Sequence, residues 1–240
     1  MTENTLLASD RELSRKKPYR VKEMFYSLQG EGARSGRAAI FCRFSKCNLW
    51  SGRETDRTTA VCDFCDTDFV GTDGAFGGDY PDAEHLADQI CALWPAPTPD
   101  STMAGKPYVI FTGGEPLLQL SVALIEVMHQ RGFEVGVETN GTLPLPEGID
   151  WVCVSPKGAA EVVVTHCDEL KLVYPQPKAM PERFTSIQAT HYFLSPMASP
   201  SADFFSDSVR LDNTRRATEY CLAHPAWRLC LQMHKILGIE

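Results

Sequence analysis

Short, nearly continuous apolar runs recur along the chain, and segments with helix signals separate most of them. Such runs predict buried strands, because a strand that is covered on both faces carries apolar side chains at consecutive positions. Strands that alternate with helices predict a parallel sheet covered by helices, with ligands at the carboxyl ends of the strands. The predicted strands are, in chain order, Val21–Tyr26, Ala38–Phe44, Tyr108–Phe111, Phe133–Glu138, Trp151–Ser155, Glu169–Tyr174, His191–Met197 and Trp227–Met233.

Three helices are expected between these strands. Pro81 opens the first, which runs through Trp94, and Pro116 occupies the first turn of the second, which ends near Gln130. Proline is favoured there because its missing N–H has no partner within the helix in any case. A cap at residue 213 or 214 (Asn or Thr) is expected to start the last helix, which ends near residue 224.

The polar segments suggest one domain with appendages. Residues 1–17 are polar and aperiodic, which predicts a flexible extension, and 18–240 are expected to form a single domain. Residues 95–107 are proline-rich and predict a surface loop. Residues 45–80 are long, polar and rich in Gly, Asp and Thr. A connection of that length inside a compact domain is usually functional.

Charge and targeting signals limit the classes of function. The formal net charge is -8, which argues against a nucleic-acid-binding surface, whose mark is a basic face. The first residues lack the apolar core of a signal peptide, and no run approaches the length of a membrane span. The sequence therefore predicts a cytoplasmic protein whose nine cysteines are thiols or metal ligands rather than disulfides.

Four of the cysteines form a pattern typical of metal binding. Cys42, Cys47, Cys62 and Cys65 read Cys-x4-Cys-x14-Cys-x2-Cys, close to a structural zinc spacing. Cys42, however, lies inside an apolar strand run, which suits a buried, inert thiol. Without it, three thiolates on an iron–sulfur cubane leave one iron open, whereas a fully protein-bound cluster has four. The cysteines alone leave zinc, an iron–sulfur cluster and a chance spacing open.

A second motif favours the cluster. FTGGEP (111–116) follows a predicted strand, and its two glycines allow the backbone to approach a ligand closely. Together the two motifs resemble the radical S-adenosylmethionine (SAM) enzymes, in which three cysteines hold a [4Fe-4S] cluster and SAM occupies the open iron. The x14 spacing departs from the usual Cys-x3-Cys-x2-Cys of that superfamily.

The sequence resembles one branch of that superfamily, the 7-carboxy-7-deazaguanine synthase family, from about Tyr19 to Glu240. The stretches that carry the resemblance are MFYSLQGEG, FCRFSKCNLWSG, VCDFCDTDFVGT, TGGEP, VETNG, VSPK, ELKLV and WRLCLQMHKILGIE. The expanded cluster loop occurs in some members. The resemblance implies a lyase of queuosine biosynthesis that converts 6-carboxy-5,6,7,8-tetrahydropterin to 7-carboxy-7-deazaguanine by a radical SAM ring contraction that releases ammonia. No side chain is expected to act as a nucleophile, since the 5'-deoxyadenosyl radical does the chemistry.

The resemblance also implies roles for individual residues. Thr67 matches a ligand of Mg²⁺, and Cys47, Cys62 and Cys65 match the cluster ligands. The positions that match SAM contacts are Phe64, Cys65, Asp66, Gly114, Glu138, Ser155, Pro156, Lys157, Ser195, Pro196, Met197 and Ala198. Those that match substrate contacts are Leu28, Gln29, Gly30, Glu31, Arg43, Thr112 and the chain-terminal Glu240.

Arg43 also has an argument from chemistry. It ends an apolar strand, and its guanidinium offers a bidentate fork for the substrate carboxylate. Such a charge-assisted bond contributes about 1.5–3 kcal/mol, whereas a surface salt bridge contributes about 0–1 kcal/mol.

The expected architecture is a truncated, open (β/α) partial TIM-type barrel of about six parallel strands. The expected cofactors are a [4Fe-4S] cluster, SAM and Mg²⁺. The expected partners are the pterin, a reductase or flavodoxin-type electron donor and a second copy in a homodimer, with neither nucleic acid nor membrane. Two alternatives stay open: a zinc-stabilised binding module, and a radical SAM activase with a protein partner.

Overall fold

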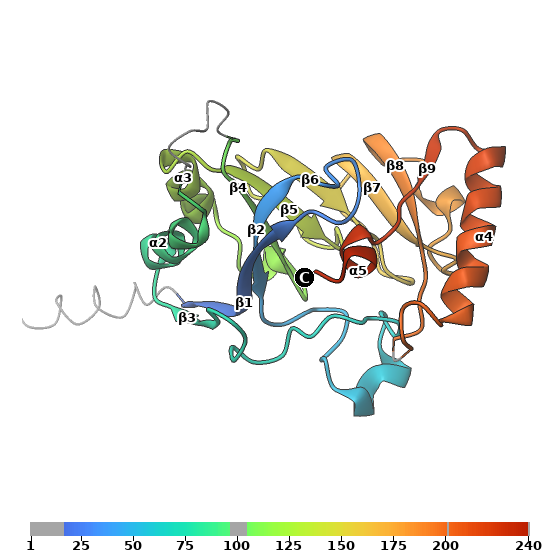
Figure 1. The fold of residues 1–240 in the computed structure, drawn as a ribbon, viewed down its shortest axis with the longest axis horizontal. Coiled ribbons are helices and arrows are strands. Elements are labelled where there is room, and N and C mark those ends of the chain that lie inside the picture. The colour runs from blue at the N-terminus through green and yellow to red at the C-terminus, as the bar shows by residue number, and fades with distance from the viewer. Residues whose placement is uncertain (1–16, 97–104, 201, 240) are drawn as a thin grey trace, which may run out of the picture.

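The computed structural model describes residues 17–96, 105–200 and 202–239. Within these ranges, one nine-stranded sheet forms the centre of the fold (Figure 1). In spatial order its strands are β3 (Gly78–Tyr80), β1 (Tyr19–Leu28), β2 (Ala38–Phe44), β4 (Tyr108–Gly113), β5 (Glu134–Thr139), β6 (Trp151–Val154), β7 (His166–Tyr174), β8 (Gln188–Pro196) and β9 (Trp227–Leu229).

Seven of these strands, β2 and β4 to β9, run parallel to one another. The first strand is an exception, since β1 pairs antiparallel with both β2 and β3. The parallel strands place their carboxyl ends at one edge of the sheet, where the loops that follow them converge.

Three longer helices pack on one face of the sheet, and the cavity described below lies on the other face. Helices α2 (Ala83–Leu93) and α3 (Val122–Gln130) pack against each other at one side, and α4 (Ser208–Ala223) packs on β8 and β9 at the other (Figure 1). The short α5 (Met233–Leu237) folds back across the sheet. A chain of buried apolar side chains fills the space between the sheet and the helices.

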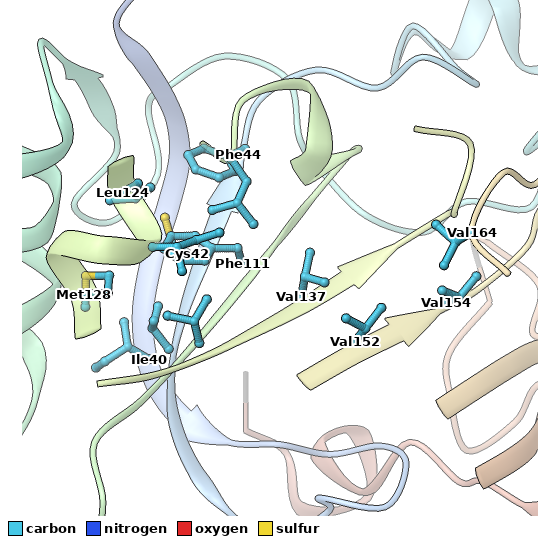
Figure 2. Close-up of a cluster of buried hydrophobic side chains, with 14 of the residues drawn as sticks. Ile40, Cys42, Phe44, Phe111, Leu124, Met128, Val137, Val152, Val154 and Val164 are labelled. Atoms are coloured by element: carbon cyan, nitrogen blue, oxygen red, sulfur yellow. The ribbon is translucent and has the colours of Figure 1, made fainter. Parts of the chain in front are cut away.

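Strand β2 shows how the sheet separates core from cavity. Ile40, Cys42 and Phe44 lie fully buried in the core beneath α3, as Figure 2 shows. Because side chains alternate along a strand, Phe41 and Arg43 point to the opposite face and line the cavity described below. The apolar run predicted here as a strand is therefore confirmed.

Two predicted helix starts are wrong. Pro116 begins only a 3₁₀ turn (Pro116–Leu118), and α3 starts later, where the Ser121 hydroxyl accepts from the backbone N–H of Leu124. The last helix starts at Ser208, because Asp207 caps it through the N–H groups of residues 209 and 210. Asn213, one of the two predicted caps, is buried within α4 and donates its side-chain N–H to the carbonyl of Met197.

Parts of the predicted organisation fall outside the described residues. These are residues 1–16 of the expected N-terminal extension, 97–104 of the proline-rich loop, and the last residue, Glu240. Among the described residues, no helix combines the length and apolarity that a membrane crossing requires.

Candidate active site

A cavity of about 600 Å³ opens at the carboxyl ends of the parallel strands. Loops from both halves of the sheet and the segment around α5 form its wall. The predicted site residues that line it are Leu28, Gln29, Gly30, Glu31, Arg43, Cys47, Cys62, Phe64, Cys65, Asp66, Thr67, Thr112, Gly114, Glu138, Ser155, Lys157, Ser195, Pro196, Met197 and Ala198. Pro156 is buried between two lining residues without reaching the cavity wall, and Glu240 lies outside the described residues.

The three cysteines assigned to the cluster all face this cavity. Cys47 follows β2, whereas Cys62 and Cys65 lie in the loop before β3. All nine cysteines of the chain are free thiols. A hydrogen bond with Cys62 lowers the pKa of Cys65 to about 6, and the same bond raises the pKa of Cys62. Burial raises the pKa of Cys47.

These positions do not match a four-cysteine zinc site. Cys42 has no exposed surface and lies in the core on the other face of β2. Tetrahedral zinc with bonds of about 2.3 Å brings its sulfurs to about 3.8 Å from one another. Within the described ranges, the cysteines form no group of three whose sulfurs lie within 4.8 Å of one another. The four-cysteine zinc module is therefore wrong, and the three thiols that face the cavity remain as candidate ligands.

The glycine turn after β4 packs directly against the segment that carries Cys47. Gly113 has φ 136°, and a Cβ there would collide with the carbonyl oxygen of Phe44. A Cβ on Gly114 would collide with the carbonyl of Lys46 and with Cys47. Only glycine fits at either position, and the bare backbone of the turn borders the cavity next to Cys47.

Glu115, the acidic residue of this turn, is a structural anchor. Its carboxylate has no exposed surface and accepts hydrogen bonds from Leu117 N (3.0 Å), Thr139 Oγ1 (2.7 Å) and Asn140 N (2.8 Å). Burial nevertheless raises its pKa. The side chain therefore ties the end of β4 to the end of β5 and holds two cavity walls in register.

Arg43 reaches the cavity with a partner on one side only. Its Nε donates to Glu23 Oε1 at 2.7 Å, and its guanidinium carbon lies 6.0 Å from the centre of the Phe25 ring. Among the described residues, its two Nη atoms have no hydrogen-bond partner. The outer edge of the fork is therefore available to an anion in the cavity.

A buried lysine organises the loop after β1. Lys171 Nζ lies 2.7 Å from Glu31 Oε2 and 2.8 Å from Glu138 Oε2. The other oxygen of Glu138 accepts from Gln29 Nε2 at 3.0 Å. Burial alone would raise the pKa of Glu31, but the Lys171 ammonium and the Gln232 amide outweigh it and lower the pKa to about 2. Lys171 therefore fixes the positions of both carboxylates and, through Glu138, that of the Gln29 amide.

The C-terminal segment closes one side of the cavity. Met233 N donates to the carbonyl of Gly30 at 2.9 Å, and a Cβ on Gly30 would collide with the His234 ring. Lys235 Nζ lies 2.5 Å from Asp66 Oδ2, which links this segment to the residue after Cys65. The segment around α5, the loop after β1 and the cysteine loop therefore meet around one opening.

Comparisons with known proteins agree with this geometry. The chain is 57% identical over 221 residues to a 7-carboxy-7-deazaguanine synthase of Bordetella pertussis, with 92% of this chain and 99% of the relative covered. A 7-carboxy-7-deazaguanine synthase of Bacteroides thetaiotaomicron is 38% identical, with 92% and 98% covered. The chain belongs to the 7-carboxy-7-deazaguanine synthase family. No protein-family model matches it.

The fold comparison supports the same architecture. A crystal structure of QueE from Escherichia coli matches with a TM-score of 0.65 at 24% identity, covering 98% of this chain and 100% of that one. At that identity the match concerns the fold alone. The predicted family is confirmed, and so is the predicted open partial barrel, which has seven parallel strands where about six were expected and an antiparallel β1 and β3 beside them.

The family resemblance did not point to Lys171 or His234, and both line the cavity. Lys171 had a signal in the sequence: it is the one charged residue inside the apolar stretch LKLVY, which a buried partner would explain. His234 has no comparable signal in the sequence. Its position depends on a contact with Gly30 that joins the two ends of the chain.

Proposed function

We propose that this member of the 7-carboxy-7-deazaguanine synthase family converts 6-carboxy-5,6,7,8-tetrahydropterin to 7-carboxy-7-deazaguanine, with loss of ammonia, for queuosine and other 7-deazapurines. The observation that carries the proposal is that three free cysteines, the glycine turn after β4 and the loop after β1 line one cavity. A volume of about 600 Å³ suits a small molecule rather than a protein partner, which disfavours the activase alternative.

The donor set fits an iron–sulfur cluster with SAM beside it. Cys47, Cys62 and Cys65 would hold the [4Fe-4S] cluster, and three thiolates leave one iron for an outside ligand. Bound there, the cluster and SAM would supply the radical that starts the ring contraction. The chain itself would position the reactants and exclude water.

The SAM side of the cavity is proposed to follow the strand ends. Gly114 would accept the close approach of SAM, and Phe64 would lie against its adenine. Lys157 Nζ donates to Ser155 Oγ at 2.5 Å, so the two polar groups after β6 are already oriented by each other. The remaining proposed SAM contacts are Cys65, Asp66, Glu138, Pro156, Ser195, Pro196, Met197 and Ala198.

The pterin side is proposed to be the loop after β1. Gln29, Glu31 and backbone groups of Leu28 and Gly30 would recognise the guanine-like edge of the pterin, which presents donors and acceptors in one plane. Glu31 stays ionised because its pKa is about 2, so it can accept hydrogen bonds from ring N–H groups. Thr112 and the terminal Glu240 complete the proposed substrate contacts.

Mg²⁺ is proposed to lie at Thr67, close to the substrate. Hard cations take oxygen ligands, and Mg²⁺ often keeps waters and uses substrate oxygens. Thr67 lines the cavity two residues after Cys65. Neighbouring carboxylates are engaged elsewhere: Asp66 with Lys235, and Asp68 with Lys22 at 2.9 Å. Substrate and water would therefore supply most of the ligands.

The proposal has three further parts. The electron donor is a flavodoxin-type or other reductase, the protein is a homodimer, and it is located in the cytoplasm. They follow from the family resemblance and from the need of a radical SAM cluster for an electron.

The proposed activity has a direct test. Iron-reconstituted protein is incubated without oxygen with SAM, a reductant, Mg²⁺ and 6-carboxytetrahydropterin, and the products are identified by mass spectrometry. We expect 7-carboxy-7-deazaguanine, at a lower rate when Mg²⁺ is omitted. Production of 5'-deoxyadenosine alone would retain the radical SAM chemistry and contradict the substrate. Absence of both products would contradict the cluster assignment.

Replacing Arg43 by alanine should weaken substrate binding and leave SAM binding unchanged. Loss of a charge-assisted bond of about 1.5–3 kcal/mol corresponds to a rise in KM for the pterin of roughly 10-fold to 150-fold. Steady-state kinetics and equilibrium SAM binding would measure the two effects separately. Glu23→Gln is the matched control, since it keeps an acceptor for Arg43 Nε and should change KM little. An equal loss of SAM affinity in Arg43→Ala would contradict this placement of Arg43.

A further inference from the structure

The segment between the first two cluster cysteines, residues 48–61, has an ordered interior. A 3₁₀ helix (Glu54–Thr59) occupies its middle, and Val61 N donates to the carbonyl of Leu49 at 3.2 Å, which closes the segment on itself. Ser51 Oγ bonds Asp56 Oδ2 at 2.6 Å across the turn. These contacts order the segment more than a passive spacer requires, so we looked for the part of the protein that the segment positions.

Arg57 spans from this segment to the backbone of the cysteine pair. One edge of its guanidinium makes a bidentate pair with Glu54, with Nε–Oε2 2.7 Å and Nη2–Oε1 2.6 Å. From the other side, Nη1 donates to the carbonyl of Asp63 at 2.7 Å and to the carbonyl of Cys65 at 2.9 Å. The same planar group therefore joins the 3₁₀ helix to both ends of the short stretch 63–65.

An aromatic platform anchors Arg57 to the body of the protein. Its guanidinium carbon lies 4.3 Å from the centre of the Trp50 ring, a cation–π distance. Trp50 is buried and meets Phe69 edge-on, with ring centres 5.6 Å apart at 82°. Phe69 is itself buried. The guanidinium is thus held by an ion pair, a ring face and two carbonyls at once.

We propose that Arg57 is a positioning residue for the Cys62–Cys65 pair, which it preforms by holding the carbonyls of Asp63 and Cys65. The inference rests on the proposed function, because it gives the long segment 48–61 a task in cluster binding. A surface salt bridge alone would not explain the geometry, since the Glu54 side chain is 74% exposed and such pairs contribute little. Arg57 differs from a surface ion pair because its Nη1 also donates to the backbone carbonyls of Asp63 and Cys65.

The residue type matters for this role. Arginine presents its donors in a rigid fork, whereas the lysine ammonium is a compact point charge. A lysine at position 57 would keep the positive charge and could not serve Glu54 and two carbonyls together. The Arg57→Lys variant therefore separates positioning from charge.

Charge adds a second expected effect. The reduction potential of an iron–sulfur cluster depends on net charge and on nearby hydrogen bonds. A fixed guanidinium next to Cys65 favours the more negative, reduced state of a cluster bound there. Removing it should shift the potential to more negative values, while the Arg57→Lys variant should show a smaller shift.

The test compares wild type, Arg57→Ala, Arg57→Lys and a matched control, Arg53→Ala. Arg53 lies in the same segment and is exposed, and among the described residues its side chain donates no hydrogen bond to a backbone carbonyl. The first readout needs no cluster: the rate at which Cys62 and Cys65 of the iron-free protein are alkylated, followed by mass spectrometry. The second and third, on reconstituted protein, are the rate of iron release to a chelator and the reduction potential.

We expect alkylation and iron release to be faster in Arg57→Ala and Arg57→Lys by about five-fold or more, because local opening of the pair becomes more frequent. Arg53→Ala should match wild type in all three measurements. Wild-type rates in both Arg57 variants would overturn the proposal, and so would an equal effect in Arg53→Ala.

A failure of the proposed function would look different. Wild-type protein would then take up no cluster, and alkylation would still show whether Arg57 holds the cysteine pair. If Arg57→Ala does not fold, as judged by circular dichroism, Glu54→Ala provides a milder variant. It removes one restraint on Arg57 and should give a smaller acceleration of alkylation, and a wild-type rate there would overturn the inference.

Discussion

Replacing Cys47 by alanine should abolish iron–sulfur cluster binding and product formation, whereas replacing Cys42 by alanine should leave both intact. Only four residues separate the two thiols in the chain, yet they lie on opposite sides of the sheet. Cys47 faces the cavity with Cys62 and Cys65, and Cys42 is enclosed by Ile40, Phe44 and Phe111 in the core (Figure 2). Only the first can act as a ligand, and two remaining thiolates do not retain a cubane.

Iron and sulfide content after anaerobic reconstitution, with the visible absorption of the cluster, would measure the difference. Cys42→Ala is the matched control, since it removes the same side chain from the same stretch. Cys42→Ala should lower the free energy of unfolding by about 1–2 kcal/mol, because a buried side chain is shortened. Loss of the cluster in Cys42→Ala, with the fold intact, would show that the fourth thiol is a ligand and reopen the zinc alternative.

The second large effect is expected when Lys171 is replaced by methionine. The variant would leave the half-buried Glu31 and Glu138 without the buried cation that they share. Removing one partner of a buried ion pair costs about 3–5 kcal/mol of stability. We also expect kcat/KM for the pterin to fall by roughly 100-fold or more, since both carboxylates and the Gln29 amide that Glu138 holds would lose their fixed positions.

The pH dependence should change in a defined direction. The pKa of Glu31 is about 2 in the native protein and near 4.5 in the unfolded chain, so its ionised form stabilises the fold above pH 4.5. That contribution is lost as the pH falls toward 2. In Lys171→Met the burial remains and the cation does not, so the pKa of Glu31 rises and the acid limb of kcat/KM moves to higher pH.

Denaturant unfolding and pH–rate profiles would test both expectations. The double variant Lys171→Met with Glu31→Gln is the matched control, because it removes one of the charges that the single change strands. It should regain part of the lost stability. Wild-type kinetics in Lys171→Met would contradict the assignment of Lys171 as the residue that positions the loop after β1.

Much of the fold was readable from local sequence because its signal is local. The run Ala38–Phe44 is a strand at both predicted ends, and the first helix differs from its predicted bounds by only a few residues. The orientation of β1 was not readable, since its residues read as a strand in either direction and only its partners decide that it is antiparallel. The start of α4 was predicted wrongly for a similar reason. Asp207 and Asn213 both have side chains that can cap a helix, but Asn213 donates its hydrogen bond to the carbonyl of Met197 instead.

The sequence by itself determined the parallel sheet, because apolar periodicity extends over only a few neighbouring positions. Its resemblance to the family pointed to many of the residues that line the cavity. Tertiary structure decided which charges meet. Lys171 pairs with Glu31 across 140 positions of the chain, and His234 packs on Gly30 from the opposite end. Such contacts depend on distances between strands, which no local pattern contains. The same holds for Arg57, whose role is visible only once its guanidinium is seen to reach the carbonyl of Cys65.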